Sequence, residues 1–353
     1  MGRVALSLLR KFLLLGALAG AAAAFGAYQY FTQWFHAPMA IGPSELTYEL
    51  KRGGSLSGAV TDLSAKQVLS HPRILLYVAK VTGRSAVKAG EYKIVSGTTP
   101  AQLLELLHRG DVVEHSITLI EGWTFAQAIA ALSEAPKLKP LLQGEDLNTQ
   151  LSMLDLPIEH PEGWFFPDTY YYTAGTTDIE ILHRAYRKMR DTLDELWQAR
   201  ALSLPYDSPY EALIMASIVE RETGAAWERQ KIAGVFVRRL NQGMRLQTDP
   251  TVIYGMGARY QGRISRADLR RPTPYNTYVI DGLPPTPIAL PGREAIFASL
   301  HPEQGSEVYF VARGDGTHSF STTLEEHNAA VRRYQLQRSS DYRSTPPPER
   351  STQ

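Results

Sequence analysis

The sequence predicts an α+β protein that consists of an N-terminal transmembrane helix, a small α+β module and a larger, helix-rich domain of mixed α+β structure. An apolar run follows three basic residues near the N-terminus, short strand-like and helical segments alternate over residues 45–112, and the segments lengthen from Glu114 onward. Domains average about 150 residues, so a chain of 353 residues that is 44% hydrophobic can form two packed domains beside the helix.

Charge and cysteine content exclude several classes of function. The chain has 37 Lys and Arg against 36 Asp and Glu, so it lacks the strongly positive surface typical of nucleic-acid binders, and we expect no such partner. With no cysteine it cannot form disulfides, Cys-ligated zinc or iron–sulfur sites, or a thiol nucleophile. The nine histidines show no spacing typical of metal ligands, so we predict neither a metal site nor a cofactor.

Residues 1–36 are expected to form a cytoplasmic N-terminus and a transmembrane anchor, with the helix at about residues 12–31. Gln29 is the one polar side chain in this run, which is long enough to cross a hydrocarbon core of ~30 Å. Three basic residues precede the run and none follows before Lys51, so the positive-inside rule places the N-terminus in the cytoplasm and the body across the membrane. The alternative is a cleaved signal peptide, because Ala17–Ala24 offers small-residue cleavage sites.

Residues 40–113 are predicted to form the small α+β module. Leu46–Leu50 is strand-like, whereas Ala101–Leu107 has the spacing of an amphipathic helix. Thr99, followed by a proline, is a suitable N-cap for this helix, and Gly110 is placed to end it.

Residues 114–337 are predicted to form the larger domain. Helices are expected near Thr124–Leu132, Asp178–Arg200, Pro209–Thr223, Ala225–Gln242, Glu294–Leu300 and Leu324–Gln337, with a β-like segment at Val308–Arg313. Met244–Arg293 reads as loop-rich. Residues 338–353 are polar and contain three consecutive prolines, so we predict a disordered tail.

The helix expected at Pro209–Thr223 carries the most informative acidic residue. Ser208 and Glu211 have the spacing of a capping box, and Gly224 is placed as a C-cap. Ala212–Val219 is apolar or small on every side, which indicates a helix buried all round. Glu220 follows directly, so its carboxyl should lose solvation, its pKa should rise, and it could donate a proton near neutral pH. The alternative is that Glu-Arg-Glu at 220–222 simply marks the solvated end of a core helix.

Four segments rich in amides, hydroxyls and aromatic rings suggest a glycan groove. They are Met244–Gly257, Thr273–Tyr278, Gly282–Pro285 and Pro161–Tyr170. Amides and hydroxyls suit sugar hydroxyl and acetamido groups, and aromatic faces suit pyranose rings. The alternative is core packing for the aromatic residues of Pro161–Tyr170, and loop capping for Gln247, Asp249 and Asn276.

These segments together resemble the YceG-like endolytic murein transglycosylases over about residues 40–336. The shared motifs are Ala-Ser-Ile-Val-Glu-Arg-Glu-Thr at 216–223, Arg-Leu-Gln-Thr-Asp-Pro-Thr-Val-Ile-Tyr-Gly at 245–255, Tyr-Asn-Thr-Tyr at 275–278, Gly-Leu-Pro-Pro at 282–285 and Glu-Gly-Trp-Phe-Phe-Pro-Asp-Thr-Tyr at 162–170. The resemblance implies a single-pass inner-membrane protein with a periplasmic enzyme that works near penicillin-binding synthases. It also implies that residues 40–113 are a LysM-like glycan-binding subdomain and that the catalytic acid is Glu220.

The reaction implied by this resemblance requires one acid. A lytic transglycosylase cleaves the bond between N-acetylmuramic acid and N-acetylglucosamine in nascent strands by attack of the muramic C6 hydroxyl, which leaves a 1,6-anhydro end and terminates elongation. Ordinary glycosidases use two carboxylates, and Glu162 is the only serious candidate for the second. The resemblance assigns sugar orientation to Glu162, Gln247, Asp249, Tyr254 and Asn276. The alternatives are a muramidase that uses water and a wall-binding scaffold of a synthase complex without enzymatic activity.

Overall fold

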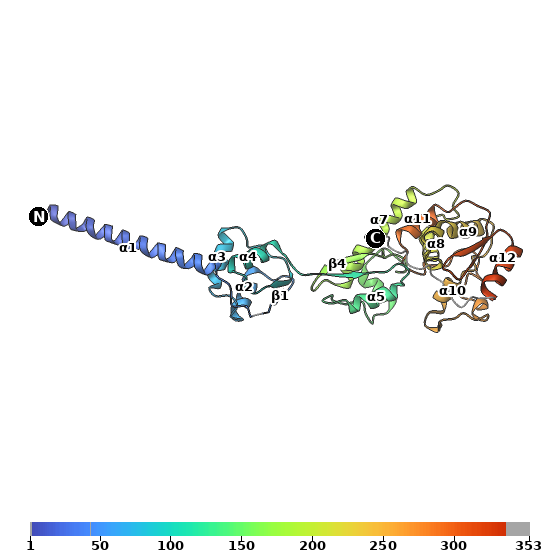
Figure 1. Cartoon of the computed structure of the whole chain (residues 1–353), viewed down its shortest axis with the longest axis horizontal. Helices are drawn as coiled ribbons and strands as arrows, with labels where there is room; N and C mark the ends of the chain where they lie inside the picture. Colours follow the sequence, from blue (N-terminus) through green and yellow to red (C-terminus); the bar gives the residue numbers. More distant parts are fainter. Residues whose placement is uncertain (1, 43, 337–353) are drawn as a thin grey trace. The chain divides into compact units, whose positions relative to one another are not determined.

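The computed structural model describes residues 2–42 and 44–336, with side chains from residue 8 onward, and shows a mixed α+β protein (Figure 1). The predicted disordered tail lies outside the described residues. The chain forms two compact units: the first contains the chain up to His115 together with Tyr172–Gly175, and the second contains the rest. β3 (Glu114–Thr118) and β4 (Thr169–Thr173) form a two-stranded sheet. The mixed α+β class predicted from the sequence is confirmed, with one N-terminal apolar helix.

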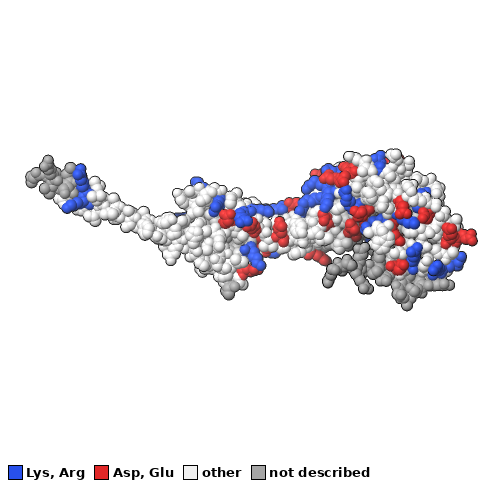
Figure 2. All heavy atoms as spheres, turned by 45° about the horizontal axis from the view of Figure 1, so that its top comes forward, with Lys and Arg blue, Asp and Glu red and all other residues white. Residues whose placement is uncertain are grey.

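The first unit begins with α1 (Gly2–His36), which extends beyond the predicted helix at both ends. Among the described residues, its segment Leu8–His36 is the one helix long and apolar enough to cross a membrane, and none of its most apolar window is buried in the protein. Figure 2 shows α1 free of charged side chains between the basic residues near its start and the body of the first unit. An exposed apolar surface of this length is stable only in contact with lipid or another apolar phase.

The body of the first unit packs three helices against one antiparallel pair of strands. The helices are α2 (Leu56–Ala65), α3 (Pro72–Val81) and α4 (Pro100–Arg109), and the strands are β1 (Leu46–Leu50) and β2 (Gly90–Ile94). Tyr48 and Tyr92 lie opposite each other in the sheet, and both are buried in the core. Thr99 caps α4 with a complete capping box, and Gly110 ends it in the left-handed region, so both predicted caps are confirmed.

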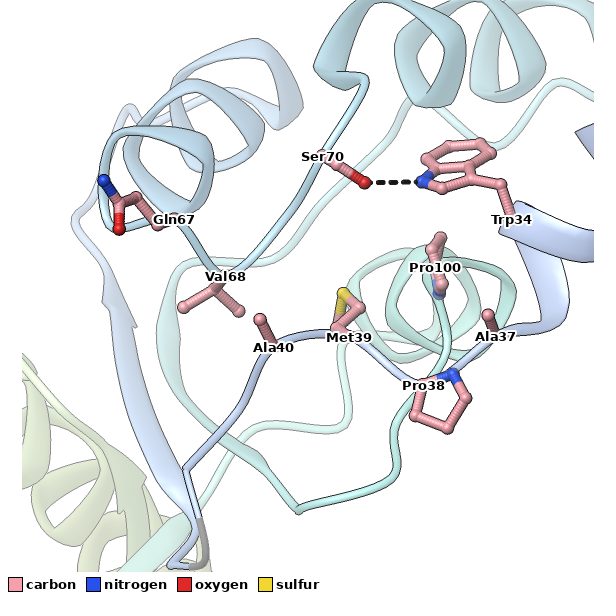
Figure 3. Close-up of a pocket in the computed structure, with 9 residues that line it drawn as sticks. All are labelled: Trp34, Ala37, Pro38, Met39, Ala40, Gln67, Val68, Ser70 and Pro100. Carbon is pink, nitrogen blue, oxygen red and sulfur yellow. Dashed lines mark hydrogen bonds between the residues drawn. The ribbon is translucent and has the colours of Figure 1, made fainter.

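The end of α1 is part of the core of the first unit. Trp34 and Phe35 pack against that core, and the indole N–H of Trp34 donates to Ser70 Oγ at 2.9 Å. Beside this contact lies a small cavity of about 210 Å³, whose walls include Met39, Val68 and Pro100 (Figure 3). The end of α1 is therefore fixed to the body of the first unit through Trp34 and Phe35.

The second unit is helix-rich. It contains α5 (Phe125–Glu134), α6 (Leu147–Leu154), α7 (Asp178–Gln198), α8 (Pro209–Glu222), α9 (Arg229–Asn241), α10 (Asp249–Met256), α11 (Arg293–Leu300), α12 (Leu324–Val331) and the hairpin of β5 (Tyr309–Ala312) with β6 (His318–Ser321). Short helical turns lie at Ala226–Glu228, Gly257–Arg259 and Asp268–Arg270, and a π-helical segment at Arg332–Leu336. Met244–Arg293 is loop-rich, as predicted. It also contains α10, a helix of 8 residues that is too short to show a periodic pattern.

The core of the second unit surrounds α8, as the sequence predicts. Every residue of Ala212–Val219 is buried, and the helix contacts α7, α9, α10 and α11. Two details of the predicted ends are wrong. The Glu211 carboxylate accepts the backbone N–H of Asp207, so only the Ser208 half of the capping box forms. Gly224 does not cap the helix, because Thr223 is already extended and its hydroxyl accepts the N–H of Ala225.

Removal of the apolar helix tests its role as an anchor. A chain that begins at Gln33 keeps Trp34 and Phe35 in the core of the first unit. It should stay in the supernatant after ultracentrifugation without detergent, because the exposed apolar surface of α1 is gone, whereas the full chain should require detergent. Aggregation of the shortened chain would contradict this. A mature N-terminus between Ala19 and Ala27 in membrane-free extracts would instead establish a cleaved signal peptide.

Candidate active site

The last turn of α8 directs three charged side chains to three different partners. Glu220 faces the segment before α11, Arg221 donates to the backbone carbonyl of Gly122 at 3.0 Å, and Glu222 accepts from the hydroxyl of Thr248. Successive residues of a helix point about 100° apart, so each side chain has its own environment. The candidate site therefore includes the last turn of α8 and the segments that its three charged side chains contact.

Glu220 has the environment of a proton donor. Its side chain is 6% exposed, and the backbone N–H of Gly292 donates to its Oε2 at 2.9 Å. Arg229 Nη2 lies 3.7 Å from Oε1. Burial raises the pKa of Glu220, the charge of Glu121 raises it further, and the Gly292 amide and the two nearby arginines offset part of this rise. The protonated form is therefore favoured relative to an exposed glutamate.

Glu121 is a second carboxylate in this region. Its Oε2 lies 3.9 Å from the same Nη2 atom of Arg229. A Cβ atom on Gly292 would fall 2.0 Å from Glu121 Oε1, so only glycine allows this carboxyl to approach the backbone there. Sequence reasoning missed Glu121, although a signal exists: the triplet Glu-Gly-Trp occurs at 121–123 as well as at 162–164.

Glu162 lies in a second buried acidic position. It is 3% exposed, and its two oxygens accept from the backbone N–H of Phe125 at 2.8 Å and from the hydroxyl of Tyr254 at 3.0 Å. Burial raises the pKa of Glu162 to about 7. The structure thus brings together two predicted site residues, Glu162 and Tyr254, which are far apart in the sequence.

Both residues line a cavity of about 730 Å³. Its other walls include Gln127, Arg221, Tyr260 and Tyr275, so it combines aromatic rings with a few polar groups. That size and composition are typical of sites that bind sugars and other small polar molecules. Glu220 is not itself among the lining residues, but its neighbour Arg221 is.

The remaining predicted site residues are already bonded to protein groups. Gln247 Oε1 accepts from Arg239 at 3.3 Å, and Asp249 Oδ1 accepts from the hydroxyl of Tyr278 at 2.7 Å. Asn276 is 1% exposed; its amide N–H groups donate to three carbonyls in the turn at 268–271, and its oxygen accepts the N–H of Tyr278. In this structure Asn276 shapes the loop that carries Tyr275 and Tyr278.

Glu222 is a third acid whose ionisation is disfavoured. Burial raises the pKa of Glu222 to about 7, the charge of Asp249 adds to the rise, and the bond from Thr248 opposes it. The sequence indicated only that Glu222 points away from Glu220. The partner of Glu222, Thr248, comes from the segment just before α10. Among residues 2–42 and 44–336, no group of three or more His, Asp or Glu side chains is placed to hold a metal ion.

The chain is similar to known proteins over most of its length. The YceG-like family matches residues 48–333. An endolytic murein transglycosylase of Bacillus subtilis (strain 168) is 33% identical over 299 residues, which cover 80% of this chain and 82% of that protein. The enzyme of the same name from Streptococcus pneumoniae serotype 2 (strain D39) is 27% identical; the alignment covers 91% of this chain but only 64% of the longer relative.

A solved structure is similar as well. The crystal structure of a putative YceG-like protein from Listeria monocytogenes matches with a TM-score of 0.50 and 30% identity, over 82% of this chain and 99% of that one. The family match, the relatives and this structure all agree with the family resemblance seen in the sequence. The protein therefore belongs to the YceG-like family of lytic transglycosylases.

Proposed function

We propose that this protein is an endolytic transglycosylase that cleaves the bond between N-acetylmuramic acid and N-acetylglucosamine in nascent peptidoglycan strands and leaves 1,6-anhydro ends. The observation that carries the proposal is the carboxyl of Glu220, held at the end of a buried helix with a raised pKa and one oxygen fixed by the Gly292 amide. Its relatives are named for endolytic cleavage of murein. Such cleavage within strands would terminate their elongation.

Glu220 would act first as acid and then as base. The Gly292 amide occupies Oε2, so Oε1 is the oxygen that carries the proton to the glycosidic oxygen. The resulting carboxylate is stabilised by that amide and by Arg229, and it then accepts the proton of the muramic C6 hydroxyl as this oxygen attacks C1. Proton transfer of this kind contributes ~10² to 10⁴ in rate, and intramolecular attack contributes through proximity.

The cavity beside Arg221 would hold the sugars. Glu162 and Tyr254 present a hydrogen-bonded pair on its wall, and by resemblance Gln247, Asp249 and Asn276 would help to orient the strand. We assign residues 114–337 to catalysis and residues 40–113 to a LysM-like module that holds glycan. In this proposal the apolar helix anchors the protein in the inner membrane, with the N-terminus in the cytoplasm and the enzyme in the periplasm beside penicillin-binding synthases.

Replacement of Glu220 tests the assignment of the acid. Glu220→Gln should keep the melting temperature within a degree or two, since the side chain has the same shape, but lose at least ~10²-fold in cleavage of purified glycan strands. Glu222→Gln is the matched control from the same helical turn and should stay active. A dead Glu222→Gln beside an active Glu220→Gln would show that the acid is misassigned, and turnover by both would point to another site.

Replacement of Gly292 tests whether close approach at this backbone position matters. In Gly292→Ala the added Cβ displaces the flexible end of the Glu121 side chain, so cleavage should fall, but by less than the ~10²-fold that direct misplacement of a reacting group by about 1 Å can cost. Gly305→Ala is the matched control, because its Cβ would fall 2.4 Å from a carboxylate oxygen of Glu307, away from the site. Equal activity of the two variants in a strand-cleavage assay would contradict the role of Gly292.

The nucleophile can be identified with labelled water. Digestion of glycan strands in ¹⁸O-water should leave muramic ends that are unlabelled, resistant to borohydride and lighter by one water than hydrolysed ends in mass spectrometry. Labelled, reducible ends would show that a second carboxylate activates water. The structure offers Glu121 and Glu162 for that role, and the reaction would then be that of a muramidase, with Glu220 still the acid.

A further inference from the structure

We propose that Glu121 and Arg229 are positioning residues that form a charge-compensating pair for Glu220 and allow it to serve in turn as acid and as base. The inference rests on the proposed role of Glu220. The observation behind it is that one guanidinium nitrogen, Arg229 Nη2, lies between two carboxylates, 3.7 Å from Glu220 Oε1 and 3.9 Å from Glu121 Oε2.

The two distances are longer than those of a tight salt bridge, so Arg229 can balance the charge of either carboxylate. Strong charge-assisted hydrogen bonds measure about 2.7–2.9 Å, and both contacts are longer. The Nε atom of Arg229 is also buried without a hydrogen-bond partner among the described residues. The guanidinium is therefore near both carboxylates without being tied to either by a short bond, and it is 15% exposed, so its charge is poorly screened by water.

The charges of the three side chains explain why both members of the pair are needed. When Glu220 is protonated, Glu121 balances Arg229 and the group is neutral. After Glu220 has given up its proton, Arg229 is the cation that stabilises the new carboxylate. Without Glu121, Arg229 would lower the pKa of Glu220 and favour its ionised form before the proton is needed. Without Arg229, Glu121 would raise that pKa and oppose ionisation. The pair therefore keeps both protonation states of Glu220 accessible.

The backbone holds Glu121 in place through contacts outside the pair. The N–H of Gly122 donates to the carbonyl of Leu290 at 2.9 Å, and the N–H of Leu290 donates to the carbonyl of Trp123 at 2.7 Å. Arg221 donates to the carbonyl of Gly122. These bonds bring the segment after Glu121 against the segment before Gly292, whose amide binds Glu220.

Apart from Arg221 of the same helix, the other charged groups near α8 have partners elsewhere. From its own helix, Arg221 faces Glu220 and binds the Gly122 carbonyl; from the α11 side Gly292 contributes only its amide. Arg293, which begins α11, pairs with Glu195 of α7. Asp249 of α10 acts on Glu222. Glu121 and Arg229 are therefore the opposed charges that face Glu220 from outside its helix.

The test is the pH dependence of kcat/KM for strand cleavage by the full chain in detergent. Activity requires protonated Glu220 and falls as pH rises through its pKa. Glu121→Gln removes a negative charge, so the alkaline limb should move to lower pH by about half a unit to one unit. Arg229→Met removes a positive charge, so the limb should move to higher pH with a lower maximal rate. The double variant should return the limb close to that of the unmodified protein.

Two further variants separate charge from structure. Arg229→Lys keeps the cation and should leave the limb in place, and Glu195→Gln, which removes a carboxylate that pairs with Arg293 beside Gly292, should not move it. Circular dichroism would show that each variant is folded. Single variants that leave the limb unmoved, or that both move it in the same direction, would overturn the inference while a dead Glu220→Gln still upheld the proposed function. Full activity of Glu220→Gln would instead remove the proposed function itself.

Discussion

The complete burial of helix α8 is the constraint on which the rest of the second unit depends. A helix without a polar face needs apolar partners on every side, and α7, α9, α10 and α11 supply them. Because the last turn of the helix lies inside this shell, the carboxyl of Glu220 is desolvated and its pKa rises. The burial that packing of α8 requires is thus also what raises the pKa of Glu220.

The same packing assembles the groups that modify this acid. Arg229 lies at the start of α9, the amide of Gly292 lies just before α11, and Glu121 follows β3. Arg229 and Gly292 arrive with helices α9 and α11, which pack on α8. Glu121 is brought there by backbone hydrogen bonds of Gly122 and Trp123 with Leu290. A change in how these elements pack would therefore alter the protonation of Glu220 as well as the stability of the domain.

Three acids in this unit have raised pKa values for the same main reason, burial, yet their partners differ. Glu220 faces a guanidinium and an amide, Glu162 accepts from a tyrosine hydroxyl and an amide, and Glu222 accepts from a threonine hydroxyl beside Asp249. Only Glu220 lies beside an arginine that can stabilise its carboxylate at short range. Such differences in surroundings allow carboxyls with similar burial to have different roles.

The sequence by itself determined the local features and the family. The caps at Thr99 and Gly110, the apolar faces of Ala212–Val219 and the motif that contains Glu220 depend on neighbours within a few residues, so they could be predicted. Sequence patterns did not predict the hydrogen bond between Glu162 and Tyr254, or the position of Glu121 and Arg229 near Glu220.

Tertiary structure decided what lies next to each of these residues. Glu220 meets Gly292 and Arg229 only because separate helices pack around α8, and contacts between distant segments leave no periodic trace in the sequence. Glu211 and Gly224 show the same limit on a smaller scale. The Glu211 carboxylate accepts the N–H of Asp207 instead of that of Ser208, and Thr223 is the C-cap that ends α8 before Gly224. Local patterns specify which elements form, whereas the burial of apolar faces specifies which side chains meet.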